Sequence, residues 1–314
     1  MSHTASLRLL SHTASLRLLS HTASLRSLYR PGQFEYAKNL AAIFKIQDVN
    51  RFKFINDFES IGHSIAAKHE NSSSTRCQPE KLHVLHDNGN NDSCQVIGCM
   101  GAGTGLGLVY LTPVLVVDED DTTTTIANGG FTKYNVFPSE GGMVDSFSPR
   151  NEIEWRLKKF LMNKYGEYIE IERIVSGPGL ADVYRFFLEE NDKHDAKLND
   201  IDEDQLGAYV SMCARNNDDD NTCHLFALQA LDLFLDVYGR ALGASAITLM
   251  CFSGLYIAGG ILSKVLWRLK QKNILVESYL NQGPKMSNIV NDIPLILIED
   301  GDVGLRGALK VAVK

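Results

Sequence analysis

Short apolar runs and longer segments with helical apolar spacing alternate along the chain from residue 34 to residue 314. A short apolar run bounded by turn residues is typical of a buried strand, and apolar residues that recur every three to four positions are typical of a helix. Strands are expected at residues 52–55, 96–100, 108–111, 254–261 and 293–298. Helices are expected at residues 34–46, 61–68, 152–165, 181–190, 223–248, 263–272 and 303–314.

Two of the expected helices have side chains that predict how they pack. The apolar stripe of helix 152–165 consists of Trp155, Leu157, Phe160 and Leu161. Helix 223–248 contains several small residues, which would permit close packing against a neighbouring helix: Gly239, Ala241, Gly243 and Ala244. The polar segments 71–93, 118–125 and 216–221 are expected to be loops, because turn-forming or acidic residues dominate them.

The first residues form a repeat that differs from the rest of the chain. Three near-identical copies of Ser-His-Thr-Ala-Ser-Leu-Arg start at Ser2, Ser11 and Ser20, and no acidic residue precedes Glu35. A spacing of nine residues keeps equivalent side chains on one face of neither a helix nor a strand. Residues 1–33 are therefore expected to be a disordered, low-complexity leader or a fault in the gene model, with a mitochondrial-type transit peptide as the less favoured alternative.

Composition limits the class of protein and its partners. The chain of 314 residues is 44% hydrophobic and 22% charged, which is ordinary for a globular protein with two domains. A net charge of −7 argues against nucleic acid or an anionic membrane as the main partner. No apolar run is long enough to span a bilayer. The six cysteines form no Cys-x-x-Cys pair, so we expect no metal site and a reduced, cytoplasmic environment.

Four alternating glycines mark the first candidate site, between the expected strands 96–100 and 108–111: Gly101, Gly103, Gly105 and Gly107. Glycine lets backbone N–H groups approach an oxyanion, which makes a phosphate-binding turn around Thr104 a candidate. The dinucleotide fingerprint fails because its sixth position is Leu106, and the Walker pattern fails because no Lys-Ser/Thr follows. An ordinary tight hairpin remains the alternative from these residues alone.

Polar residues follow other expected strands and turns. Asn56 and Asp57 come directly after strand 52–55, where α/β enzymes place catalytic groups, although helix capping is the favoured explanation of such a pair from these residues alone. Glu140 precedes Gly141 and Gly142, which would leave room for a ligand, or it is a solvated loop charge.

Two further turns could approach a ligand through their backbone. The turn Ser-Gly-Pro-Gly at 176–179 leads into helix 181–190, so free N–H groups are expected to face whatever lies in front of it. The pair Gly259 and Gly260 ends the strand 254–261 and would let a flat ring approach the backbone.

The order of these motifs resembles the bacterial-type glucokinase family. The matching segments are 54–58, 101–107, 140–145, 172–180 and 257–261, and the resemblance covers about residues 34–314. It implies an α/β, actin-like (ribonuclease H-like) two-domain sugar kinase that phosphorylates glucose with ATP and Mg²⁺, with a homodimer as its assembly. The implied domains are a small, truncated one (34–70 plus 299–314) and a larger one (71–298), with the cleft between them.

The resemblance also assigns roles to residues. Asp57 resembles the catalytic base that takes the proton of the sugar 6-hydroxyl. Asn56, Glu140 and Glu172 resemble ligands of the sugar hydroxyls, with Gly141 beside them. The turn from Gly101 to Gly107 resembles the second phosphate loop, and Gly259 with Gly260 resembles the adenosine motif.

Two departures from the family pattern qualify this function. Met143 stands where the family has histidine, and a thioether is a poor hydrogen-bond partner for a sugar. No Asp-x-Gly-Gly-Thr, the first phosphate loop of the family, precedes Asn56. We therefore expect an unpaired sheet edge and poor or absent glucose phosphorylation. The alternative to an active kinase is a catalytically impaired relative that binds sugar or nucleotide.

Overall fold

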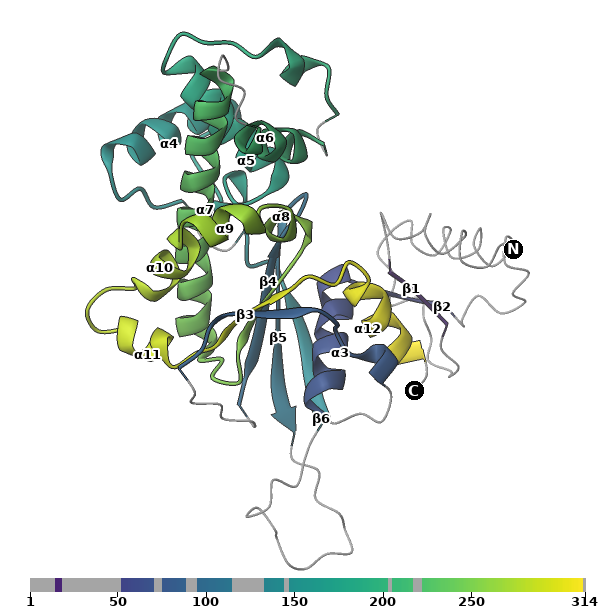
Figure 1. Cartoon of the computed structure of the whole chain (residues 1–314). Coiled ribbons are helices and arrows are strands. Elements are labelled where there is room, and N and C mark those ends of the chain that lie inside the picture. Colours follow the sequence, from purple (N-terminus) through teal and green to yellow (C-terminus); the bar gives the residue numbers. More distant parts are fainter. Residues whose placement is uncertain are drawn as a thin grey trace, which may run out of the picture. The chain divides into compact units, whose positions relative to one another are not determined.

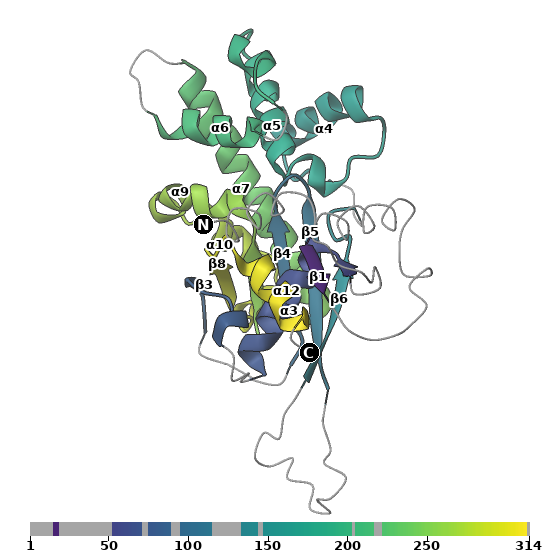
Figure 2. The same ribbon diagram turned by 90° about the vertical axis from the view of Figure 1, so that its right-hand side faces the viewer.

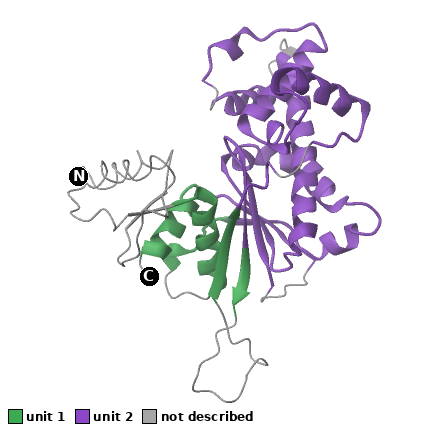
Figure 3. Ribbon diagram, turned by 180° about the vertical axis from the view of Figure 1, so that it is seen from behind, with its two compact units in different colours: residues 1–81, 111–138, 300–314 green, residues 82–110, 139–299 purple. Residues whose placement is uncertain are grey.

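The computed structural model describes residues 15–18, 52–70, 75–88, 95–114, 133–143, 147–202, 205–216 and 222–312 (Figure 1). The expected helix 34–46 and the expected loop 118–125 lie outside these residues, as does most of loop 216–221. Contacts divide the chain into two compact units, residues 1–81, 111–138 and 300–314 in unit 1 and residues 82–110 and 139–299 in unit 2 (Figure 3). Except for residue 299, the segments expected in the smaller domain fall in unit 1, which also includes 1–33, 71–81 and 111–138. The domain boundaries stay a prediction.

Unit 1 contains a pair of strands and a pair of helices. Strand β1 (Ser15–Leu18) pairs antiparallel with β2 (Phe52–Ile55), so the backbone of the second repeat copy contributes a strand beside the expected strand 52–55. Helix α3 (Asp57–His69) follows β2, and the 3₁₀ turn η3 (Thr75–Cys77) and helix α12 (Val303–Ala312) belong to the same unit. The strand residues 111–114 and 133–138 of the larger sheet also fall in unit 1.

Helices α3 and α12 lie side by side (Figure 2). A Cβ atom at Gly307 would clash with the carbonyl oxygen of Ser60, so the two backbones touch at this glycine. Lys310 Nζ forms an ion pair with Glu70 Oε2 at 2.6 Å, and both side chains are largely buried. Apolar packing and one buried ion pair therefore hold helices α3 and α12 together.

A six-stranded sheet in the order β3-β8-β7-β4-β5-β6 carries the candidate site. Its strands are β3 (Leu82–His86), β4 (Ile97–Ala102), β5 (Leu106–Val114), β6 (Lys133–Ser139), β7 (Leu255–Ala258) and β8 (Leu295–Ile298). Strands β4, β7 and β8 are parallel, and β3 is antiparallel to β8. Because ligands of parallel sheets bind beyond the carboxyl ends of the strands, the residues after β4 and β7 are placed for binding.

The other described helices belong to unit 2. They are α4 (Glu152–Tyr165), α5 (Gly177–Glu189), α6 (Leu206–Arg215), α7 (Thr222–Leu249), α8 (Gly260–Lys264), α9 (Leu266–Gln271), α10 (Ile274–Leu280) and α11 (Ser287–Asn291), with 3₁₀ turns η5 (Ile171–Arg173) and η6 (Ala196–Asn199). The close packing expected of α7 is confirmed, because a Cβ atom at Gly239 would meet the Cβ atom of Ser278 on α10 at 2.9 Å. No helix among the described residues is long and apolar enough to cross a membrane.

Four expectations about these elements were wrong. Strand β3 lies within the expected loop 71–93. It was not predicted because histidines interrupt the apolar pattern of this edge strand. Trp155 is 51% exposed, because two residues of helix rotate it about 200° away from the buried Leu157. Helix α5 begins at Gly177, four residues before the expected start, and the expected helix 263–272 is two helices that meet at Val265.

Candidate active site

The glycine-rich stretch forms a strand-turn-strand, as predicted. Strand β4 ends at Ala102, β5 begins at Leu106, and the Gly103 N–H donates to the Gly105 carbonyl oxygen over 2.8 Å within the turn. Gly103 and Thr104 are exposed at its tip. Gly101 is buried within β4 and Gly107 lies within β5, so Gly103, Thr104 and Gly105 form the part of the predicted phosphate loop that can face a ligand.

Glu172 lies directly against this turn. Its Oε2 accepts a hydrogen bond from the Leu106 N–H at 2.8 Å, and a Cβ atom at Gly105 would come within 2.7 Å of the same oxygen. The Glu172 N–H donates to the Gly142 carbonyl oxygen at 3.3 Å, and the Gly142 N–H donates to the Leu106 carbonyl oxygen at 3.1 Å. Three of the predicted site segments in unit 2 therefore meet at one point.

The turn after β6 presents Glu140 at the surface. The Met143 N–H donates to the Glu140 carbonyl oxygen at 3.0 Å, and both side chains are exposed. The sequence suggested that Gly141 leaves room for a ligand, but Leu108 fills that space. An added Cβ atom at Gly141 would lie 2.6 Å from the Leu108 Cβ atom. The Gly141 and Gly142 positions are therefore small so that this turn can pack on β5.

The start of α5 does not present free N–H groups, contrary to the expectation from Ser-Gly-Pro-Gly. The Gly177 N–H donates to the Gly103 carbonyl oxygen at 2.7 Å. Pro178 has no N–H, and the Gly179 N–H donates to the capping Ser176 Oγ at 3.0 Å. The helix start is thus used to fix the glycine turn, and its first donors are already satisfied.

The predicted adenosine motif lies beside the same turn. In the parallel register of β4 and β7, Gly101 is opposite Ala258, so both strands end at the same edge of the sheet. Gly259 has a φ of +97°, and an added Cβ atom would lie 2.5 Å from the Ala102 carbonyl oxygen. Glycine is required there by both conformation and space. Gly260 is exposed and begins α8.

Asn56 and Asp57 belong to unit 1, at the start of α3. Asn56 Oδ1 accepts from the Phe58 N–H at 2.8 Å and the Glu59 N–H at 3.2 Å, so the helix cap considered from the sequence is confirmed. Asp57 is exposed, and its Oδ1 accepts from the Phe58 N–H at 2.9 Å. The cap does not exclude a second role, since the Asn56 amide N–H₂ group is a donor that capping does not use.

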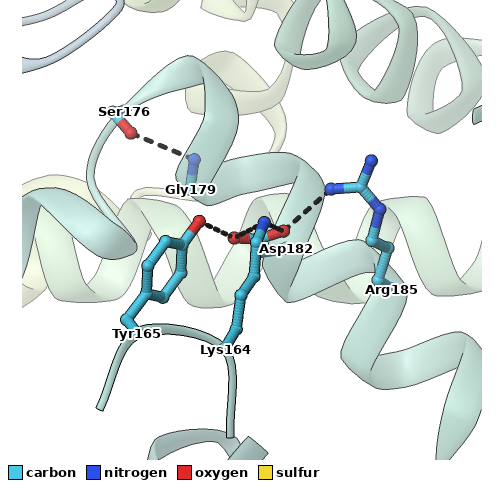
Figure 4. Close-up of polar contacts among 6 residues, drawn as sticks. All are labelled: Lys164, Tyr165, Ser176, Gly179, Asp182 and Arg185. Carbon is cyan, nitrogen blue, oxygen red and sulfur yellow. Dashed lines mark hydrogen bonds and ion pairs between the residues drawn. The ribbon is translucent and has the colours of Figure 1, made fainter. Parts of the chain in front are cut away.

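A cavity of about 440 Å³ opens beside the glycine turn, within unit 2. Its lining residues are Thr104, Lys164, Tyr165, Glu172, Arg173, Ser176, Pro178 and Gly179. No sequence pattern selects Lys164 or Tyr165, because they end an ordinary amphipathic helix. Their relevance arises only from the packing of α4 against α5, and Figure 4 shows both side chains directed at Asp182.

Comparison with known proteins identifies the family. The family model described as Glucokinase matches residues 37–314. The glucokinase of Nostoc punctiforme is 33% identical over 276 residues, which cover 83% of this chain and 70% of that relative. The glucokinase of Escherichia fergusonii is 29% identical over 276 residues, 87% of this chain and 72% of the relative.

Two solved structures have the same fold. Glucokinase from Balamuthia mandrillaris, in complex with glucose, has a TM-score of 0.63 and 24% identity and covers 83% of this chain and 65% of its own. Glucokinase from an Antarctic psychrotroph has a TM-score of 0.61 and 24% identity, with coverage of 82% and 67%. The expected α/β fold of the actin-like sugar kinases is confirmed, and the chain belongs to the glucokinase family.

Proposed function

We propose that this chain transfers the γ-phosphate of ATP to the 6-hydroxyl of glucose and forms glucose 6-phosphate. The observation that supports this best is the bond between Glu172 and Leu106, which ties a sugar-type carboxylate to a phosphate-type glycine turn. Glu172 Oε2 is engaged by Leu106, so Oε1 is the oxygen that would accept from a sugar hydroxyl. Glu140 and Asn56 would bind further hydroxyls.

Asp57 is the proposed general base. Its exposed carboxylate would take the proton of the 6-hydroxyl as that oxygen attacks the γ-phosphorus, while the bond from the γ-phosphorus to the bridging oxygen breaks and ADP leaves. Phosphoryl transfer needs little beyond such positioning and charge neutralisation. Gly103, Thr104 and Gly105 fit the phosphates because the turn exposes backbone without bulky side chains, and Gly259 with Gly260 fits the adenosine. Mg²⁺ is proposed as the counter-ion of ATP, and the homodimer and the cytoplasmic location stay predictions.

The experiment is a coupled assay of glucose-dependent ADP release by the whole chain, paired with calorimetry. Replacing Asp57 by asparagine should lower turnover by about 10²- to 10⁴-fold, the usual contribution of a general base, with less than about a twofold change in ADP affinity. Glu59→Gln, on the same turn of α3, is the matched control and should retain turnover. Equal turnover in wild type and Asp57→Asn would contradict the assignment.

A second candidate function is a catalytically impaired protein that binds sugar or nucleotide. It is favoured by Met143, whose thioether is a poor hydrogen-bond partner for a sugar. The same measurements separate the two functions. Binding of glucose or ADP without any turnover in the wild type would support this second candidate and reject the kinase.

A further inference from the structure

The end of α4 and the 3₁₀ turn η5 each supply one cation to the cavity beside the glycine turn. Lys164 and Arg173 both line the cavity, together with Thr104 at the tip of the turn. The lining also contains the Glu172 carboxylate, whose Oε2 accepts from the Leu106 N–H. An anionic group that enters the cavity would therefore meet two cations, a hydroxyl and one carboxylate beside the predicted phosphate loop, so cations outnumber carboxylates in the lining.

Asp182 fixes the position of Lys164. Its carboxylate is only 1% exposed and accepts from Lys164 Nζ at 2.8 and 2.9 Å, from the Tyr165 hydroxyl at 2.6 Å and from Arg185 NH1 at 2.8 Å (Figure 4). One negative charge thus faces two cations, and positive charge remains on the cluster. A carboxylate buried to this degree with four bonds holds its partners in a defined geometry.

Tyr165 connects the two cations of the lining. The Lys164 Nζ lies 4.8 Å and the Arg173 guanidinium 4.5 Å from the centre of its ring, both within the range of cation–π attraction. Arg173 is also held by Glu170, with 3.0 Å between Nε and Oε2. Burial lowers the pKa of Lys164, but its bonds to Asp182 and Tyr165 outweigh this and raise the pKa above its usual value, so the ammonium stays charged at neutral pH.

We infer that Lys164 and Arg173 bind the phosphate chain of the nucleotide that occupies the glycine turn, and that Asp182 is the residue that positions Lys164 for this contact. The inference rests on the proposed use of ATP. The nucleotide is chosen over a free sugar because the cavity reaches Thr104 of the phosphate-type turn and offers cations, which a neutral sugar does not need. Lys164 and Arg173 are thereby residues of substrate binding, and Asp182 is a positioning residue.

The test is calorimetry of the whole chain with ADP and, separately, with glucose, at low and high salt. Lys164→Met should weaken ADP binding about tenfold, reduce the salt dependence of ADP affinity, and leave glucose affinity within twofold. Lys164→Arg should restore ADP binding, because it keeps the cation. Asp182→Asn, which keeps the shape of the side chain, should weaken ADP binding in the same direction. Lys159→Met, an exposed position on α4 outside the cavity lining, is the matched control and should bind ADP as the wild type does.

The outcomes distinguish this inference from the proposed function. Equal ADP affinity and equal salt dependence in wild type and Lys164→Met, with ADP bound by both, would overturn the role of Lys164 and leave ATP use standing. Glucose affinity lowered as much as ADP affinity would also overturn it, since the effect would then not be specific to the phosphates. A wild-type chain that binds no ADP would reject the inference together with ATP use.

Discussion

Glu172 and Leu106 are joined by a hydrogen bond of 2.8 Å from the Leu106 backbone N–H to the Glu172 side chain, between residues 66 positions apart. The bond places the carboxylate that we propose as a sugar ligand against the first residue of β5, directly after the glycine turn. The proposed sugar and phosphate sites are therefore coupled through one backbone group. A change in the turn should alter the sugar site without touching the sugar.

Gly105→Ala should weaken glucose binding about tenfold. The new Cβ atom would lie 2.7 Å from Glu172 Oε2, so the carboxylate has to move away from its bond to Leu106. Calorimetry with glucose measures the effect. Gly103→Ala is the matched variant in the same turn, where no atom lies within 4 Å of the new Cβ, and it should leave glucose affinity unchanged. Equal glucose affinities in the two variants would contradict the coupling.

Substitutions of Asn56 should separate its cap from its proposed sugar contact. Asn56→Ala removes the acceptor of the Phe58 and Glu59 N–H groups and should lower the free energy of unfolding by about 1 kcal/mol. It should also weaken glucose binding. Asn56→Ser keeps a capping oxygen but has no amide, so it should retain stability and still bind glucose weakly. Urea denaturation and glucose calorimetry of both variants check this. If Asn56→Ser binds glucose with the affinity of the wild type, Asn56 acts only as a helix cap.

The packing of α3 on α12 should tolerate alanine at one glycine of α12 and not at another. Gly307→Ala should lower the free energy of unfolding by more than about 2 kcal/mol, because its Cβ atom clashes with the rigid Ser60 carbonyl group. Gly304→Ala, three residues earlier in the same helix, meets no atom within 4 Å and should stabilise the helix by about 0.5–1 kcal/mol. Thermal unfolding of the two variants beside the wild type measures both changes, and a neutral Gly307→Ala would show that the helices can separate.

The free energy of unfolding should fall as the pH drops from about 6.5 to about 4, in part through His69. Burial, with a smaller effect from Lys68, lowers the pKa of His69 from 6.5 to about 4. Between these values the unfolded chain binds a proton that the folded chain does not, so the folded state loses up to about 3 kcal/mol as the pH falls, and nothing above pH 6.5. His69→Gln should flatten this part of the profile in urea denaturation. An unchanged slope would contradict the burial of a neutral ring.

Local sequence patterns predicted the glycine turn, α4, α7 and the strands next to them, because alternation, helical spacing and glycine clusters act over a few residues. Strand β3 escaped prediction because its role is set by pairing with β8, more than 200 residues away. The donors at the start of α5 were expected to be free for the same reason: only the folded chain brings the Gly103 carbonyl oxygen to the Gly177 N–H.

The charged lining of the cavity could not be predicted either. Lys164 and Asp182 lie 18 residues apart on two helices, and no sequence motif distinguishes a paired lysine from the many that are only solvated. The ordered motifs did predict Asn56, Glu140 and Glu172 as a set, through resemblance to the family. What the structure adds is a hydrogen-bond network that joins Glu172 to Gly142 and to the glycine turn.

Met143→His should strengthen glucose binding about fivefold. Met143 is 50% exposed in the turn that holds Glu140, and its thioether cannot donate to a sugar oxygen. Imidazole can donate from one ring nitrogen and accept at the other, and histidine is the residue of the family pattern at this position. The gain of one hydrogen bond to a neutral hydroxyl corresponds to about 1 kcal/mol.

Met143→Leu is the control, since it keeps an apolar side chain of similar size and should bind glucose as the wild type does. Because the change lies outside the cavity lining, ADP affinity should stay the same in both variants. If Met143→His and Met143→Leu bind glucose equally, residue 143 does not contact the sugar, and the departure from the family pattern has no bearing on sugar affinity.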